Sequence, residues 1–392
     1  MLFVLARGLS VSASEDVPEG ETQTEHEPEG DEEPQDNVDV RVTELRARVS
    51  PQLEVVLPSG NFYAHFVTNF NNLEIAFNLS FSVLGNTLGG DLGVSYPIKT
   101  FTPYVTFFQH IDFENYFAPD ISGGEIVLVP TEKYLRRDRG FDLGSRWEAA
   151  DNFAIRPSVV FDEVFKGDLT KSVVLEEGVD IVPQTSFEYD SLRAEKTETD
   201  PVHVGLYIKS NFSLRYRDDF DTPVEADNRN RLSFYHRAGQ RWFFDEEATL
   251  NYPLKIWRSD LATYYSLGGF ETIRGYDEGS IPSLRFFLLS LNVERAIFYG
   301  RELRFKLLKN PVKVHQFRLV LLSDTLLSQD RIYGGAPVDF YSGAGGGISF
   351  TFSGSGSTHF QFKVCAAQAL TGEFAPIVYL RSSLLKYETR IK

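Results

Sequence analysis

The sequence predicts an all-β protein, a transmembrane antiparallel β-barrel of about sixteen strands. Three observations favour it: apolar and polar residues alternate through most of the chain after residue 60, the alternating runs reach ten to fifteen residues, and 14% of the residues are aromatic. A period of two gives a strand one apolar and one polar face. Crossing a bilayer at a tilt takes ~9–11 residues, whereas strands of globular domains usually have ~5–6.

The alternation is clearest in two segments. In 73–83 every odd position is apolar, and in 202–216 every even position is apolar except Ser210. Long continuous apolar runs, as in parallel α/β sheets, and amphipathic helical windows are absent from the sequence. The predicted strands are 61–70, 72–84, 90–98, 100–113, 123–137, 140–149, 153–166, 179–192, 202–217, 230–251, 254–267, 283–296, 312–325, 339–353, 357–370 and 374–385.

The links between the predicted strands differ in length. Short turns at 71–72 and 354–356 alternate with longer links at 166–178, 218–229 and 268–282. Short turns at one rim and long loops at the other are typical of outer-membrane barrels, and closure satisfies strand edges that hydrocarbon would leave unpaired. The alternative is a soluble protein of two stacked sandwiches, which explains the alternation but neither the strand length nor the abundance of Phe and Tyr.

The amino-terminal segment differs from the rest of the chain in charge. Residues 1–40 hold twelve acids and one base, Arg7, so they carry −11 of the net charge of −16. We expect 14–58 to be an acidic disordered tail and linker and 59–392 to be the barrel. Residues 1–13 are apolar and end in a motif similar to a signal-peptidase site, but Arg7 interrupts the apolar run and no base precedes it. A truncated or atypical signal segment and no signal at all both stay open.

Composition excludes several functional classes. A net charge of −16 without a basic stripe argues against a nucleic-acid partner. A single Cys excludes a disulfide scaffold and a Cys-based zinc cluster, and the seven His show no metal-ligand spacing, so we expect no metal and no cofactor. The segment His110-Ile111-Asp112 is the one cluster that suggests catalysis. A pair on one strand more often forms a local hydrogen bond, so we expect no enzymatic activity.

One motif points to a family. Gly268-Gly269 is followed, after three residues, by Ile273-Arg274-Gly275-Tyr276. This run resembles the signature of the BamA/TamA superfamily of outer-membrane assembly and translocation barrels, also called the bacterial surface antigen domain. In that family the segment ends one strand and opens a long loop that folds back into the barrel lumen. The resemblance implies a lumen-loop motif made of Gly268, Gly269, Ile273, Arg274, Gly275 and Tyr276.

Two acidic residues are candidate anchors for this loop. Glu294 shares strand parity with Asn292, and Asp324 shares parity with Arg318, in each case opposite apolar residues, so both carboxylates should face the lumen. Arg274 is expected to pair with Asp324, with Glu294 or with both, because an arginine fork matches a carboxylate bidentately. The resemblance implies that this contact holds the loop and is needed for activity. The alternative is that Arg274 is a solvated loop residue.

The resemblance extends over roughly residues 230–385. Leu284–Arg295 resembles the twelfth strand of the family and Phe317–Asp324 the thirteenth, although only the Asp of the expected Phe-Asp-x-Gly-like motif is present. The glycine-rich segment 341–347 resembles the fourteenth strand. Residues 50–230 match only in strand pattern. A barrel that starts near residue 60 leaves no room for a POTRA domain, the βα module of about 75 residues that precedes the barrel in BamA-type proteins.

The expected function is insertion or translocation of polypeptides at the outer membrane, with a passive or gated pore as the alternative. The expected partners are the lipid bilayer and unfolded or nascent outer-membrane polypeptides. The barrel is expected to be monomeric, with or without accessory subunits. The expected location is the bacterial outer membrane, with an organellar outer membrane as the alternative.

Overall fold

The computed structural model describes the chain from β1 onward, with short gaps. The described residues are 52–57, 61–70, 72–82, 87–122, 125–168, 173–191, 204–238, 241–258, 261–269, 272–277, 279–307, 310–330, 337–353, 358–372 and 375–386. Within them, no helix is long and apolar enough to cross a membrane.

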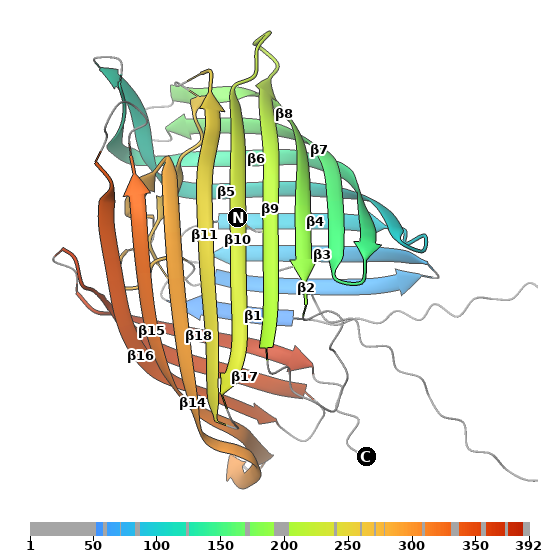
Figure 1. Ribbon diagram of the computed structural model, residues 1–392, viewed down its shortest axis with the longest axis vertical. Helices are drawn as coiled ribbons and strands as arrows, with labels where there is room; N and C mark the ends of the chain where they lie inside the picture. The colour runs from blue at the N-terminus through green and yellow to red at the C-terminus, as the bar shows by residue number, and fades with distance from the viewer. Residues whose placement is uncertain are drawn as a thin grey trace, which may run out of the picture.

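Sixteen of the strands in this part of the chain form a closed antiparallel barrel (Figure 1). They are β1 Gln52–Leu57, β2 Asn61–Phe70, β3 Leu73–Ser82, β4 Thr87–Ser95, β5 Phe101–Ser122, β6 Glu125–Ala150, β7 Phe153–Asp168, β8 Val173–Asp190, β9 Val204–Arg217, β10 Glu225–Ala238, β11 Trp242–Ile256, β14 Arg285–Leu307, β15 Asn310–Gln329, β16 Asp339–Ser353, β17 Thr358–Ala369 and β18 Ile377–Lys386. Two further strands, β12 Tyr265–Leu267 and β13 Ile281–Ser283, pair with each other in a separate small hairpin.

Each barrel strand pairs with its neighbours in sequence, with one interruption. β11 pairs with β14, because the chain between them leaves the wall and forms the β12–β13 hairpin. The ring closes where β1 pairs with β18, from Glu54 opposite Ser383 to Leu57 opposite Leu380. Long strands, antiparallel pairing and closure agree with the fold that the sequence predicts.

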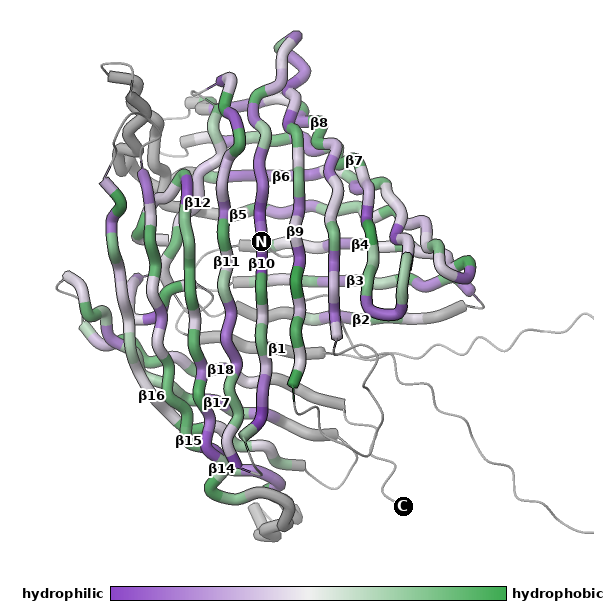
Figure 2. The backbone as a smooth tube through the Cα atoms, viewed as in Figure 1, coloured by the Kyte–Doolittle hydropathy of each residue, from purple (hydrophilic) through white to green (hydrophobic). Residues whose placement is uncertain are grey.

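The two faces of the wall differ in polarity, as the alternation predicts. Hydropathy alternates along the strands (Figure 2). On β9 the apolar side chains of Val204, Ile208 and Phe212 are exposed on the outer face. Arg217, of opposite parity, is 3% exposed because it lies among acids inside the barrel. A bilayer solvates the apolar outer face, and ion pairs satisfy the charges of the inner face.

The predicted number of about sixteen barrel strands is confirmed. The numbers agree because errors in the bounds of individual predicted strands cancel. β6 runs unbroken from Glu125 to Ala150, where the sequence predicts two strands, 123–137 and 140–149. The charged segment between those predictions stays in the sheet because β5 and β7 both pair along it. Local polarity alone could not reveal this support from both sides.

The opposite error occurs further along. The sequence predicts one strand over 230–251, but β10 ends at Ala238 and β11 begins at Trp242. The predicted strand 254–267 is also wrong. Only its first residues belong to β11, which ends at Ile256, and its last three form β12 in the small hairpin.

The barrel also begins earlier than expected. β1, at Gln52–Leu57, falls inside the segment 14–58 that was expected to be tail and linker, and it pairs with β2 and β18 to complete the ring. Six residues are too few for a clear alternating pattern, so only the partners on both sides reveal this strand. The rest of the expected tail, and the expected signal segment 1–13, lie outside the described residues.

The links between the strands differ in length from those that the sequence predicts. Between β7 and β8 only 169–172 lie outside the strands, against a predicted link of 166–178. The link 257–284, from the end of β11 to the start of β14, includes the predicted loop 268–282 but starts earlier. This segment, hereafter the lumen loop, carries the motif Gly268–Tyr276.

Candidate functional site

The lumen loop is a hairpin with the motif at its turn. β12 and β13 pair from Tyr265 opposite Ser283 to Leu267 opposite Ile281, and the motif begins directly after β12. Leu267, Thr272 and Arg274 line a cavity together with inward-facing side chains of the barrel wall. The loop therefore projects into the lumen, as the resemblance implies.

The motif glycines allow a turn that other residues would not tolerate. Gly268 and Gly275 have φ values of +126° and +94°, in the region that favours glycine. A Cβ on Gly268 would lie 2.1 Å from the Asp277 carbonyl oxygen, and one on Gly275 would lie 2.5 Å from the Ala369 backbone nitrogen. The first glycine closes the turn on itself, and the second lets the loop backbone touch the wall at β17.

The loop turn also satisfies its own backbone groups. The Thr272 hydroxyl lies 2.7 Å from both the backbone nitrogen and the carbonyl oxygen of Gly268. The Gly269 backbone nitrogen donates to the Tyr276 carbonyl oxygen at 3.0 Å. A segment buried in a lumen needs such internal partners, because an unpaired backbone group costs about as much as a lost hydrogen bond.

Arg274 holds Asp324 with three donors. Its Nε donates to Oδ2 at 2.6 Å, its backbone nitrogen donates to the same oxygen at 2.9 Å, and its Nη2 donates to Oδ1. Its Nη1 donates to Asn292 Oδ1 at 2.6 Å. Arg274 is 6% exposed and Asp324 1%. This is the bidentate contact that the sequence predicts, and the alternative of a solvated Arg274 is wrong.

The side chains of Ile273 and Tyr276 pack against apolar residues beside this ion pair. Both are fully buried, in a cluster that also contains Leu267, Ile281, Phe286, Leu288, Leu326 and Ala369. The Tyr276 hydroxyl lies 2.9 Å from the Thr371 carbonyl oxygen and 3.1 Å from the Ser342 carbonyl oxygen, so it can donate to either. The motif thus holds the loop in place by an ion pair, by apolar packing and by the hydrogen bonds of a buried hydroxyl.

The wall supplies two features that sequence reasoning did not assign. The Tyr379 hydroxyl on β18 accepts a hydrogen bond from the Gly275 backbone nitrogen at 2.8 Å. On β16, a Cβ at Gly343 would lie 2.0 Å from the Arg274 carbonyl oxygen. The glycine-rich stretch of β16 was the available signal, since glycine within a strand often marks a close backbone approach.

Glu294 does not share the anchoring of the loop, contrary to the expectation. Its carboxylate accepts hydrogen bonds from Arg318 Nη1 at 2.8 Å and Lys363 Nζ at 3.1 Å. Asp324 stands opposite Ser290 on β14, four residues from Glu294, which is about 13 Å at ~3.3 Å per residue. Both acids face the lumen as predicted, but only Asp324 is level with the loop turn.

No family profile and no curated protein sequence matches the chain. Solved barrels do match. CdiB from Escherichia coli aligns with a TM-score of 0.61 and 12% identity, over 86% of this chain and 62% of that one. BamA from Haemophilus ducreyi lacking POTRA domains 1–3 aligns with a TM-score of 0.58 and 12% identity, over 87% of this chain and 71% of that one.

The chain has a BamA/TamA-like barrel fold. CdiB from Acinetobacter baumannii also aligns, with a TM-score of 0.54 and 9% identity, over 85% of this chain. The chain spans 62% and 59% of the lengths of the two CdiB chains. The described residues of this BamA/TamA-like barrel contain the wall and the lumen loop, and no POTRA domain.

The BamA/TamA-like barrel encloses a polar cavity of about 480 Å³ beside the loop. Charged side chains of both signs face it, including Lys209, Arg231, Asp245 and Glu247. Arg231 and Glu247 pair at 2.5 Å across β10 and β11. An ion pair of the wall thus faces the cavity beside the loop.

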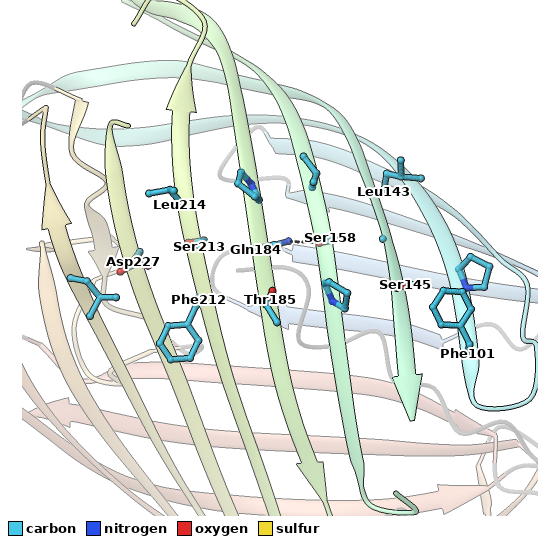
Figure 3. A pocket seen from close by; sticks show the side chains of 16 residues that line it. Phe101, Leu143, Ser145, Ser158, Gln184, Thr185, Phe212, Ser213, Leu214 and Asp227 are labelled. Atoms are coloured by element: carbon cyan, nitrogen blue, oxygen red, sulfur yellow. Dashed lines mark hydrogen bonds between the residues drawn. The ribbon is translucent and has the colours of Figure 1, made fainter. Parts of the chain in front are cut away.

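A second hollow, of about 710 Å³, is lined by wall residues from β5 to β11 (Figure 3). Exposed apolar side chains border it, among them Leu143 and Phe212, and its lining includes Pro157 and Pro183. The pairing of β6 with β7 skips the residues around Pro157, and that of β8 with β9 skips those around Pro183. Proline has no N–H to donate, so fewer backbone hydrogen bonds join the strands at this level.

The cluster that suggested catalysis is only partly described. His110 Nε2 lies 3.0 Å from Asp91 Oδ1 on the neighbouring strand β4. The side chain of Asp112 lies outside the described residues. Within the described part of the chain, no group of three or more His, Cys, Asp or Glu residues is placed to hold a metal ion.

Proposed function

We propose that this BamA/TamA-like barrel acts in insertion or translocation of polypeptides at the outer membrane, most directly the bacterial outer membrane in which its structural neighbours are found. The observation that carries the proposal is the Arg274–Asp324 contact, which places the family-like motif inside a closed barrel. The turn of the lumen loop is hydrogen-bonded to four wall strands, β14, β15, β16 and β18, which supports a structural role for the loop inside the barrel.

The seam between β1 and β18 is the place where a polypeptide strand would enter the wall. Among the described residues, four pairs join β1 to β18, while ten join β17 to β18. Each pairing hydrogen bond contributes a net ~0.5–1.5 kcal/mol, so the shorter seam opens at the lower free-energy cost. Opening exposes strand edges that hydrocarbon cannot satisfy. An incoming strand of an unfolded outer-membrane polypeptide would satisfy them by β-augmentation.

The lumen loop supports this role by bracing the wall next to the seam. Its turn is bonded to Asp324 on β15 and to Tyr379 on β18, the strand that forms one side of the seam. The β14–β18 wall thus stays ordered while β1 separates from it. The bilayer and the entering polypeptide are the partners in this proposal, the barrel acts as a monomer, and the proposal includes no enzymatic step.

A reconstituted insertion assay with a locked seam tests the proposal. In a Cys365→Ala background, Val55→Cys and Ser382→Cys place thiols at paired positions of β1 and β18. Oxidation should abolish insertion of an unfolded barrel polypeptide into liposomes, and reduction should restore it. The matched control lock is Thr351→Cys with Gln361→Cys, paired positions of β16 and β17, which should leave insertion intact. Equal insertion with both locks oxidised would overturn the proposal.

The second candidate is a passive or gated pore, which the polar cavity of about 480 Å³ favours. Deletion of residues 268–280 separates the two functions. In a pore, the deletion raises conductance and insertion of other polypeptides is unaffected. In the assembly role, it raises conductance and also lowers insertion, because the brace beside the seam is lost.

A further inference from the structure

The lumen loop contacts the wall a second time, at β9 and β10, apart from the contacts of Arg274. At its start, the backbone nitrogens of Trp257 and Arg258 both point to the Val224 carbonyl oxygen, at 3.0 and 3.2 Å. A few residues further, the Leu261 carbonyl oxygen accepts a hydrogen bond from Arg215 Nη2, and the Thr263 backbone nitrogen donates to Glu225 Oε2 at 3.0 Å. One arm of the loop is thus bonded to two charged side chains of the wall.

These two side chains form a pair with each other. Arg215 on β9 and Glu225 on β10 stand directly opposite in the register, and Arg215 Nη2 lies 3.2 Å from Glu225 Oε2. Glu225 is 3% exposed. The same carboxylate oxygen therefore accepts from both the Arg215 guanidinium and the loop backbone, so the pair holds this arm of the loop.

A neighbouring ion network keeps Arg215 in place. Its Nη1 lies 3.6 Å from Asp180 Oδ2 on β8, and Asp180 is itself held by Arg217 through bonds of 2.5 and 3.0 Å. Arg217 also reaches Glu176 at 2.7 Å. Asp180 on one side and Glu225 on the other restrict the rotation of the Arg215 guanidinium. The wall, and not the loop, therefore orients Arg215 toward the Leu261 carbonyl oxygen.

The two attachments lie on different parts of the wall. Arg215 and Glu225 belong to β9 and β10, whereas Arg274 is bonded to Asp324 on β15. In the ring order, β11 and β14 stand between them. Arg229 on β10 adds to the first attachment, since its guanidinium lies 5.7 Å from the Tyr265 ring centroid at the foot of the hairpin.

We propose that Arg215 and Glu225 are positioning residues that form a second, independent anchor of the lumen loop, so that the loop ties the β9–β10 wall to the β14–β18 wall. Releasing either anchor alone loosens the loop and makes openings more frequent while the other anchor still holds it, and the lumen clears fully only when both are released. The inference builds on the proposed function, because the braced wall adjoins the seam. It concerns only where the loop sits, so it can hold or fail whether or not polypeptides are inserted.

Spin labelling of the loop arm tests the second anchor directly. A nitroxide at Ala262→Cys, in a Cys365→Ala background of the full chain in liposomes, reports the mobility of the arm between the two contacts. Arg215→Ala and Glu225→Ala should each add a mobile spectral component that the parent lacks, while Arg274→Ala should leave the label at 262 largely immobile. Equal immobility in the parent and in both wall variants would overturn the proposal.

Channel recording gives the second readout, with a matched control from the same wall. Arg231→Ala likewise removes a cation of the wall and breaks its ion pair, that with Glu247, but the contact of Arg231 is to the wall and not to the loop. Arg215→Ala should raise the frequency of large openings several-fold over Arg231→Ala. Arg215→Ala combined with Arg274→Ala should exceed either single variant. A double variant no more open than Arg274→Ala would count against two independent anchors.

Conservative variants keep the test decisive if the alanine variants fold poorly. Glu225→Gln retains an oxygen for the Thr263 backbone nitrogen but loses the charge, and Arg215→Lys retains the charge but loses the fork. The loop arm should be less mobile in Glu225→Gln than in Glu225→Ala. The insertion assay with the locked seam is run on the same proteins, so a failure of the anchor and a failure of the proposed function give different results.

Discussion

Gly343 on β16 lies against the backbone of Arg274, so close that a Cβ at position 343 would be 2.0 Å from the Arg274 carbonyl oxygen. The ion pair between Arg274 and Asp324 therefore depends on a glycine in a third strand. The carbonyl oxygen belongs to backbone, which cannot rotate away as a side chain does. Gly343 is thus the point of β16 on which the loop turn rests.

Gly343→Ala should lift the loop turn from the wall. Overpacking of this kind typically costs ~1–3 kcal/mol, and here the clash is met by the residue that carries the ion pair. We expect a lower thermal unfolding temperature and more frequent large channel openings. Gly93→Ala on β4 is the control, because its Cβ would meet nothing nearer than 3.5 Å. A Gly343→Ala protein that behaves like the Gly93→Ala protein would contradict the contact.

Arg274→Ala should leave the Asp324 carboxylate buried without its cation. Removing one partner of a fully buried pair costs ~3–5 kcal/mol, and less where water reaches the site. We expect destabilisation in thermal unfolding together with raised conductance in planar bilayers. Because the two residues act as a unit, Arg274→Ala with Asp324→Ala should cost less than the sum of the single changes. Additive costs would show that the residues do not interact.

Asp324→Asn and Glu294→Gln should have different effects although both acids face the lumen. Asp324 bonds the loop, whereas Glu294 bonds Arg318 and Lys363 of the wall. Asp324→Asn should raise conductance, and Glu294→Gln should lower stability with the gating unchanged. Channel recordings of the two variants side by side decide this. Equal gating effects would restore the expectation that both acids anchor the loop.

Tyr276→Phe should loosen the loop without creating a cavity. The change removes a buried hydroxyl that lies 2.9 Å from the Thr371 carbonyl oxygen, and a buried acceptor left without a donor costs ~1–3 kcal/mol. Thermal unfolding should show the loss. Tyr252→Phe is the control, since that side chain is exposed on the outer face and its ring contact with Arg285 does not need the hydroxyl. A loss of thermal stability no larger than that of Tyr252→Phe would contradict this role of the Tyr276 hydroxyl.

The part of the site that sequence predicts best is the part set by local rules. Strand parity placed both Asp324 and Glu294 in the lumen, and the geometry of an arginine fork predicted that Arg274 pairs with one or both of them. The role of Glu294 could not be found this way, because parity says which face a residue takes but not its height on the barrel. That height depends on the register of β14 against β15, which sets Asp324 opposite Ser290.

The strand count shows the same limit. Residues 125–150 alternate imperfectly, and only the pairing of β6 with β5 and β7 keeps them in one strand. β1 is too short to be recognised from its own six residues, and it is a strand because β2 and β18 flank it. In both cases the neighbours across the sheet decide the structure.

The sequence by itself determined the class of fold, the inward and outward faces and the motif at the loop turn, because each follows from residues close together in the chain. The tertiary structure decided which strands meet, the partners of Glu294, the fit of Gly343 under Arg274 and the attachment of Leu261 and Thr263 to Arg215 and Glu225. The contacts of Glu294 and Gly343 join residues about seventy positions apart in sequence, and the pairing of Leu57 with Leu380 closes the ring over more than three hundred. They arise only when closure of the barrel fixes the register and height of each strand, which is a property of the whole sheet and not of any one segment.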